Sequence, residues 1–266
     1  MAHQPPNPPS KRSQHRLAIQ VAFAALWLIP LRMFGICSPV FHCYACPLAA
    51  FACPVGVLAQ FSALHAVPFI ALGMLGVAGA IFGGFVCGWA CPFGLLQDLA
   101  AKVPTPKFEL PAWSGSFRYA VLAGLVIAVP WYFGESHPLF FCRVCPAGAL
   151  EVAGPAAIQS LHAGVPIIWP NGLKIGVTLA VVAAMFFIRR PWCRALCPLG
   201  AIFGLFSRIS MFTVRFYPSR CNECGLCEKT CGYGVESAVR ADDPQCIRCL
   251  ECARCKACEV VPAWKK

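Results

Sequence analysis

Charged side chains are scarce in this sequence. Asp, Glu, Lys and Arg together make up 12% of the 266 residues, whereas hydrophobic residues make up 58%. This proportion of apolar residues is too high for an ordinary soluble domain of this length. The composition excludes a typical soluble protein and predicts an integral membrane protein.

Acidic residues are especially few. The chain has 11 Asp and Glu against 22 Lys and Arg, which gives a formal net charge of +11. A basic excess of this size would suit a nucleic-acid-binding protein, but the count treats all 19 cysteines as neutral. A cluster held by four thiolates carries a net charge of about −2. Bound clusters would offset much of the excess, and no nucleic-acid partner is expected.

The sequence also lacks a residue set suited to hydrolysis, group transfer or nucleotide binding, so its chemistry rests on cysteine. From about Ser207 the apolar character ends, and a Cys-x2-Cys-x2-Cys rhythm appears twice in residues 207–266, the tail. The pattern is close to that of bacterial ferredoxins with two [4Fe–4S] clusters, in which the fourth cysteine of each run binds the other cluster. Zinc is the main alternative, although it fits isolated Cys-x2-Cys pairs better than three consecutive cysteines.

The tail is expected in the cytosol, because clusters need reduced thiols during assembly. The first tail cluster is expected on four cysteines: Cys221, Cys224, Cys227 and either Cys255 or Cys258. The second is expected on Cys231, Cys246, Cys249 and Cys252.

Two further pairs share the motif Cys-x3-Cys-Pro, and we call them the inner pairs. They are Cys87 with Cys91 and Cys193 with Cys197. Thiols four residues apart lie about one helical turn apart and can face one metal centre. Each pair supplies half of a four-thiolate set, so the interpretation is one [4Fe–4S] cluster shared by both pairs. Buried free thiols are the alternative.

Four apolar runs are each expected to form a transmembrane helix. They cover residues 17–36, about 66–86, about 116–134 and about 173–189. Lys and Arg concentrate on one side of these runs, which puts the N-terminus, both inner pairs and the tail on the cytoplasmic side. The expected fold is an all-α integral membrane protein with four transmembrane helices, followed by a small ferredoxin-like domain.

The expected membrane part contains two similar halves, which indicates an internal duplication. Residues 34–47 match residues 133–146 at Phe-Gly, Pro, Phe and Cys-x2-Cys-Pro. Each half runs helix, outer Cys-x2-Cys-Pro, His, helix, inner Cys-x3-Cys-Pro, which makes a duplicated two-helix unit with re-entrant outer segments. The expected divisions are a disordered cytoplasmic N-terminus at 1–16, repeats at 17–110 and 111–206, and the ferredoxin-like domain at 207–266.

The outer pairs are Cys43 with Cys46 and Cys142 with Cys145. By the same symmetry they are expected to share a fourth [4Fe–4S] cluster, whereas disulfides, structural or redox-active, are the alternative on an oxidising side. Another arrangement adds Cys37 and Cys53 to the first outer pair without the second half. The symmetry argument favours the shared site and leaves these two as spare thiols or as neighbours that tune it.

Three other side chains are candidates for cofactor binding. His65 and His162 are paired by the repeat, so they could bind a haem or line a quinol site, or simply hydrogen-bond backbone at a helix start. Asp98 could accept a proton from quinol. It also precedes Lys102 by four residues, the spacing of a helical ion pair.

The inner motifs, which continue as residues 93–98 and 199–204, together with the two-cluster tail, resemble the NapH and NosR type of ferredoxin-like membrane proteins over about residues 17–258. The resemblance implies electron transfer between the quinol pool and periplasmic respiratory reductases, or support of their assembly.

We therefore expect a multi-pass electron carrier of a bacterial or archaeal cytoplasmic membrane. It would link its clusters to a quinone or a partner oxidoreductase, as a quinol dehydrogenase or as a redox subunit of a membrane complex. The alternative is an accessory factor that reduces a metal or a thiol during maturation of a respiratory metalloenzyme. The outer cysteines distinguish these two hypotheses. A cluster there favours an electron carrier with a continuous series of clusters, whereas a dithiol–disulfide couple favours a maturation factor.

Overall fold

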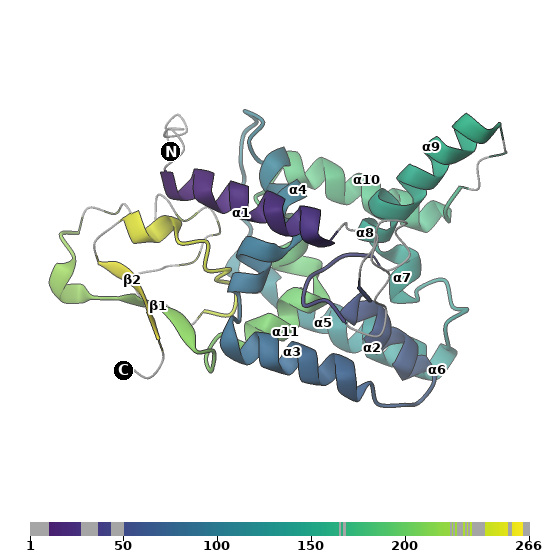
Figure 1. Cartoon of the computed structure of the whole chain (residues 1–266), viewed down its shortest axis with the longest axis horizontal. Coiled ribbons are helices and arrows are strands. Elements are labelled where there is room, and N and C mark those ends of the chain that lie inside the picture. Colours follow the sequence, from purple (N-terminus) through teal and green to yellow (C-terminus); the bar gives the residue numbers. More distant parts are fainter. Residues whose placement is uncertain are drawn as a thin grey trace.

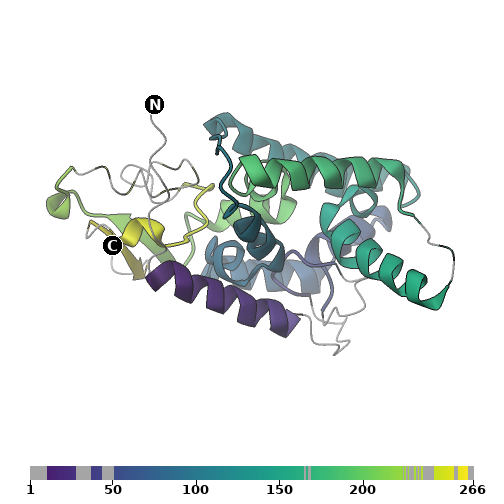
Figure 2. The same cartoon turned by 90° about the horizontal axis from the view of Figure 1, so that it is seen from above.

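The structure is a computed structural model that describes residues 11–27, 37–43, 51–164, 166, 169–223, 225, 227, 231, 233, 235, 243–254 and 257–262. Most of these residues are helical. The helices gather into one body, and the described part of the tail lies against one end of it (Figures 1 and 2).

The first half of the chain runs from beside the tail into the helical body (Figure 1). Its elements are α1 (Lys11–Trp27), α2 (Pro54–Ala63), α3 (Phe69–Ile81), the π-helical turn η1 (Val86–Ala90) and α4 (Pro92–Ala100). Helix α1 packs against η1 and α4, and α2 packs against α3. These contacts bring the start of the chain onto the first inner motif.

The second half opens with an almost continuous helical run and continues with shorter helices. The run consists of the 3-10 turn η2 (Ala112–Ser116), α5 (Phe117–Val121), the π-helical η3 (Leu122–Ala128) and α6 (Val129–Phe133). It is followed by α7 (Phe141–Val144), α8 (Pro146–Gly148), the π-helical η4 (Ala149–Ala153), α9 (Gly154–Ala163), α10 (Gly172–Phe187), the π-helical turn η5 (Trp192–Leu196) and α11 (Pro198–Phe206). Helix α11 packs against α3 and α5, so the two halves meet along it.

The tail contains a small antiparallel sheet. Strand β1 (Phe212–Phe216) pairs with β2 (Cys258–Pro262), and Phe212 lies opposite Pro262 while Phe216 lies opposite Cys258. Both strands are rich in valine, threonine or phenylalanine, which fit a pleated surface. Two 3-10 turns, η6 (Pro218–Arg220) and η7 (Glu251–Arg254), accompany the sheet. The expectation of an all-α chain is therefore wrong.

The expectation of four transmembrane helices is also wrong. Within the described ranges one helical stretch, Trp113–Phe133, is long and apolar enough to cross a membrane, with 21 residues and a mean hydropathy of 1.4. The run expected at 66–86 is interrupted, because Pro68 precedes α3 and Gly83, at a φ of +52°, follows it. Helix α3 has 13 residues and α10 has 16. At about 1.5 Å per residue both are shorter than a hydrocarbon core of about 30 Å.

The apolar core has Phe41 near its centre. Its ring lies 5.6 Å from that of Phe93, 6.1 Å from Trp192 and 6.3 Å from Phe141, measured between ring centroids. Phe93 and Trp192 belong to the two inner motifs, whereas Phe41 and Phe141 lie beside the outer cysteines. Segments expected on opposite sides of a membrane thus meet in one core.

Candidate metal centre

The two inner motifs have the same local structure. In each, a π-helical turn, η1 or η5, carries the first cysteine, and the second cysteine caps the next helix. Cys91 (φ −79°, ψ 119°) and Cys197 (φ −73°, ψ 114°) are both extended. The following proline disfavours helical dihedrals at the cysteine and itself suits the first position of a helix. The sequence Cys-Pro therefore sets the direction in which both capping thiols point.

The structure brings the inner pairs together. Cys87, Cys91, Cys193 and Cys197 all line one pocket, which we call the inner pocket. Phe41, Leu199 and Phe203 form apolar parts of its wall. Four thiols from two halves of the chain are the donor set that a [4Fe–4S] cluster uses.

The charge around the inner pocket also suits a cluster. Arg118 lines the pocket, is 3% exposed, and its Nε has no hydrogen-bond partner among the described residues. A buried cation of this kind needs a compensating anion. Burial raises the pKa of the Cys193 thiol to about 12, although Arg190 opposes the rise. Ionising four buried thiols here without a metal would cost much free energy. Bound iron would balance most of the thiolate charge, and Arg118 would balance the net negative charge that a cluster retains.

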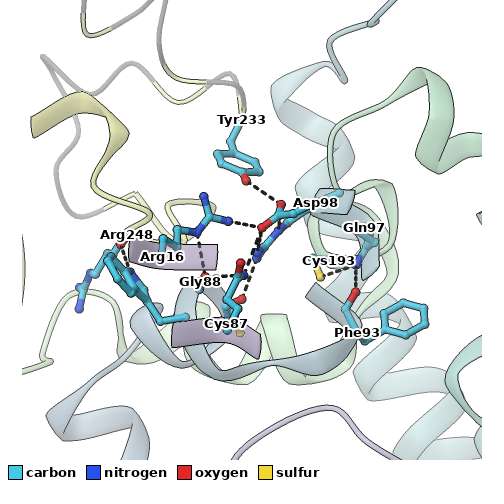
Figure 3. Close-up of polar contacts among 12 residues, drawn as sticks. Arg16, Cys87, Gly88, Phe93, Gln97, Asp98, Cys193, Tyr233 and Arg248 are labelled. Atoms are coloured by element: carbon cyan, nitrogen blue, oxygen red, sulfur yellow. Dashed lines mark hydrogen bonds and ion pairs between the residues drawn. The ribbon is translucent and has the colours of Figure 1, made fainter. Parts of the chain in front are cut away.

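One side chain donates a hydrogen bond to a sulfur of the inner pairs. Gln97 is fully buried, and its Nε2 donates a hydrogen bond of 3.0 Å to Cys193 Sγ (Figure 3). A second bond, of 3.3 Å to the Phe93 carbonyl, holds the amide in place. Hydrogen bonds to cluster sulfurs tune reduction potential, so Gln97 would influence a cluster held by Cys193, and the sequence analysis did not single it out. The signal was its place on α4, six residues after Cys91.

A second pocket lies in the tail. Cys231, Cys246, Cys249 and Cys252 line this tail pocket. They are the four cysteines expected to hold the second tail cluster. Tyr233 and Arg248 also line it.

The remaining tail cysteines gather beside the sheet. Cys221 and Cys227 pack in one apolar cluster with Cys258, which is 4% exposed on β2. Cys224 and Cys255, both predicted as ligand candidates, lie outside the described residues. The packing makes Cys258 a neighbour of the first run.

The inner pocket and the tail pocket share a wall. Cys246 and Ile247 line both. This close approach requires glycine: a Cβ on Gly84 would lie 2.6 Å from the Cys246 carbonyl oxygen, and one on Gly88 would collide with that of Ile247. Trp89 Nε1 donates a 3.0 Å hydrogen bond to the Arg248 carbonyl and fixes the same segment.

Arg248 anchors the tail to the helical body. Its side chain is 1% exposed and donates to Ser210 Oγ at 2.6 Å and to the Ser207 carbonyl at 2.6 Å, with a further bond to the Phe212 carbonyl. A buried guanidinium satisfied by several acceptors holds a rigid position. The segment between Cys246 and Cys249 is thereby fixed over η1.

Asp98 ties together parts of the chain that are far apart in sequence. Arg190 donates to it through Nε at 2.8 Å and Nη2 at 2.6 Å, Arg16 forms a second ion pair, and the Tyr233 hydroxyl donates at 3.3 Å (Figure 3). Burial acts to raise the pKa of Asp98, but the two arginines outweigh it and the net pKa is lowered. The carboxylate is thus held ionised by Arg16 and Arg190, and no ion pair with Lys102 is recorded in the described part of the chain.

The outer cysteines also converge, with one unexpected member. A Cβ added at Gly148 would lie 3.5 Å from Cys43 Sγ, so Cys43 reaches the segment that follows Cys145. Cys53 and Cys145 share the main apolar core, and Cys142 packs against it. Cys46 lies outside the described residues. Cys53, which was expected to be a spare thiol or a neighbour that tunes the outer site, lies in this neighbourhood.

The two histidines lie elsewhere. His65 is exposed after the end of α2, at a φ of +55°, with its ring centroid 4.3 Å from that of Trp131. His162 is exposed in the last turn of α9. Neither side chain lines the inner pocket or the tail pocket.

Cysteines in the described ranges do not crowd around a single ion. No three His, Cys, Asp or Glu side chains there stand at the spacing of one metal ion. This spacing does not conflict with a cluster, because each thiolate of a [4Fe–4S] cluster binds a different iron.

Sequence comparisons agree with the inner site. The family described as 4Fe-4S binding domain matches residues 63–111 and 171–216, two segments that each contain one inner pair. The duplicated match supports an iron–sulfur protein. No solved structure matches the chain.

Three relatives illustrate the similarity. An uncharacterized protein of Methanocaldococcus jannaschii is 29% identical over 65% of this chain and 67% of its own length. The methylamine utilization ferredoxin-type protein MauN of Paracoccus denitrificans is 39% identical over 24% of each chain. The regulatory protein NosR of Pseudomonas aeruginosa is 26% identical over 61% of this chain but 21% of its own length. The chain thus spans only about a quarter or less of MauN and NosR.

The resemblance seen in the motifs is confirmed by these matches. The inner pairs fall in the matched segments, and the relatives include a ferredoxin-type protein and NosR itself. The chain is thus similar to ferredoxin-type iron–sulfur proteins of the NapH/NosR type in the segments that contain both inner pairs.

Proposed function

We propose that the chain carries electrons between a cluster in the inner pocket and the clusters of its own tail. The observation that carries this proposal is the wall that the two pockets share at Cys246 and Ile247. Bound clusters supply the chemistry, since each accepts and releases one electron. The protein's part is to hold the sites in contact and to keep water away from them.

Several side chains have defined roles in this arrangement. Cys87, Cys91, Cys193 and Cys197 hold the inner cluster, and Arg118 compensates its charge. Trp89 and Arg248 hold the tail against the first inner motif through the hydrogen bonds described above. A quinone or a partner oxidoreductase, such as another subunit of a membrane redox complex, exchanges electrons with one end of this path.

The proposal includes a place at the cytoplasmic membrane, with the tail on the cytoplasmic side. The stretch Trp113–Phe133 supports it, because large aromatic residues are exposed at both of its ends: Trp113 is 66% exposed, Tyr132 78% and Phe133 62%. Aromatic residues favour the two interfaces of a bilayer. Retention of the protein in the membrane fraction after an alkaline carbonate wash is expected, and release by that wash would contradict this part.

The test of the electron path uses Cys91→Ala and Cys197→Ala. Each variant should lose the same paramagnetic signal from the reduced, anaerobically purified full chain, together with about four iron atoms, because each inner pair supplies half of one ligand set. The tail signals should remain and lose their magnetic coupling to a neighbour. If one substitution were silent while the other removed the signal, the shared inner site would be wrong.

A further inference from the structure

A four-residue motif, Cys-Pro-x-Gly, occurs both in the inner pairs and at two cysteines that the proposed function does not use. It occurs at Cys53, Cys91, Cys145 and Cys197. At all four positions the cysteine is the extended residue before a helix and the proline begins that helix. The backbone dihedrals agree closely: φ −72° and ψ 121° at Cys53, against φ −67° and ψ 121° at Cys145.

This motif changes the correspondence between the two halves. Cys46 is followed by Pro-Leu-Ala and lacks the glycine, whereas Cys53 and Cys145 both have it. Cys91 and Cys197, the other two members, line the same inner pocket. By structure, Cys53 is therefore the counterpart of Cys145, as Cys91 is of Cys197.

The surroundings of these cysteines converge on one place. Helix α2, which Cys53 caps, packs against α7, which carries Cys142. Cys43 Sγ reaches Gly148, the glycine of the Cys145 motif. Cys53 and Cys145 are each 8% exposed. Two cysteines from each half thus face a common apolar interior.

The charges nearby suit an anionic group. Lys174 Nζ would lie 3.0 Å from a Cβ on Gly148 and donates to the Cys142 carbonyl at 3.4 Å. Glu151 fixes the backbone of the site by accepting from the Cys43 amide at 2.7 Å, and His42 Nδ1 lies 2.9 Å from the same carboxylate oxygen.

We infer that Cys43, Cys53, Cys142 and Cys145 form a second four-thiol site in the helical body, which takes a [4Fe–4S] cluster. This inference rests on the proposed function, which it extends by one step. Phe41 lines the inner pocket and its carbonyl lies 3.9 Å from Cys91 Sγ. Cys43 follows two residues later, at most about 7 Å along the chain, so the second site adjoins the inner one.

The test compares four variants of the full chain purified without oxygen. Cys53→Ala and Cys145→Ala should each lose about four iron atoms and four sulfides per chain, with the inner and tail signals retained. Cys46→Ala should keep full iron. Cys37→Ala is the matched control, because Cys37 is 6% exposed but packs in a separate apolar cluster with Ala52 and Ala71.

Two outcomes would overturn the inference. Full iron in Cys53→Ala would exclude Cys53 as a ligand. Loss of iron in Cys46→Ala would instead assign the four ligands to the two outer Cys-x2-Cys pairs. The proposed function fails separately, if the native chain lacks the signal that Cys91→Ala and Cys197→Ala should remove. Retained tail signals show in each variant that the chain has folded.

Discussion

Gln97 donates a hydrogen bond of 3.0 Å to the sulfur of Cys193 from a fully buried position on α4. The two residues lie in different halves of the chain. This hydrogen bond to an inner cysteine comes from a side chain that is not itself a candidate ligand. Gln97 can therefore be replaced while all four inner cysteines are kept.

Gln97→Leu should lower the reduction potential of the inner cluster, because a hydrogen bond to sulfur stabilises the more negative, reduced state. A tenfold change in the one-electron equilibrium corresponds to about 59 mV, and the shift should be of that order. A redox titration followed by electron paramagnetic resonance measures it. Gln60→Leu is the control, since Gln60 instead donates to Glu135 in an exposed pair. An unchanged potential in Gln97→Leu would contradict the role of this bond.

Gly88→Ala should loosen the tail, because the added methyl group collides with the Ile247 carbonyl oxygen. Overpacking of this kind costs roughly 1–3 kcal/mol. The expected result is weaker magnetic coupling between the inner and tail clusters and faster cleavage of the tail by protease. Gly76→Ala on α3 is the matched control, since its new Cβ meets open space. Equal coupling in both variants would show that the close approach is unimportant.

Asp98→Asn should destabilise the protein by roughly 3–5 kcal/mol, because Arg16 and Arg190 would lose their counter-charge in a buried place. The folded pKa of Asp98 is lowered, so its contribution is complete above its unfolded value and is lost only when the pH falls through the lower, folded value. The penalty should therefore be the same at pH 6 and pH 8, measured as the shift in thermal midpoint.

The control for that experiment is Glu259→Gln, which removes an ion pair with Arg220 that is more than half exposed on both sides. Exposed pairs contribute little, and no measurable change is expected. A penalty for Asp98→Asn that shrinks toward pH 6 would mean that Asp98 takes up a proton there, as expected of a proton acceptor for quinol.

Cys258→Ala should remove one of the two tail clusters, whereas Cys255→Ala should leave both. Cys258 is buried on β2 with Cys221 and Cys227, which are two ligands expected for the first tail cluster. Loss of about four iron atoms from the first variant alone is the expected count. The reverse result would assign the ligand to Cys255.

Local sequence motifs carried much of the candidate site. The repeated Cys-x3-Cys-Pro led to a shared inner site, and the four inner cysteines do line one pocket. The three-cysteine run, with Cys231 added, led to the set that lines the tail pocket. In both cases proline and short spacing fix the direction of a thiol within a single turn, so the sequence predicts which cysteines lie together.

Hydropathy was a poorer guide to the fold. It counted residues 66–86 as one span, yet Pro68 and Gly83 confine the helix to 13 residues. Spacing also hid the structural similarity of Cys53 to Cys145, because matching by Cys-x2-Cys paired Cys46 with Cys145. Arg248 bonds to Ser210, and Arg16 pairs with Asp98. Both contacts join residues far apart in sequence, so no local sequence pattern predicts them.

The wall shared by the inner pocket and the tail pocket bears on how the protein matures. Pro244, Cys246 and Ile247 form part of the inner pocket, yet they are synthesised after all four inner cysteines. One side of the inner pocket is therefore missing until this part of the tail has been made. Cofactor insertion at this site is then a late step, and a chain truncated before Pro244 would present its inner thiols uncovered to oxidants and to stray metal ions.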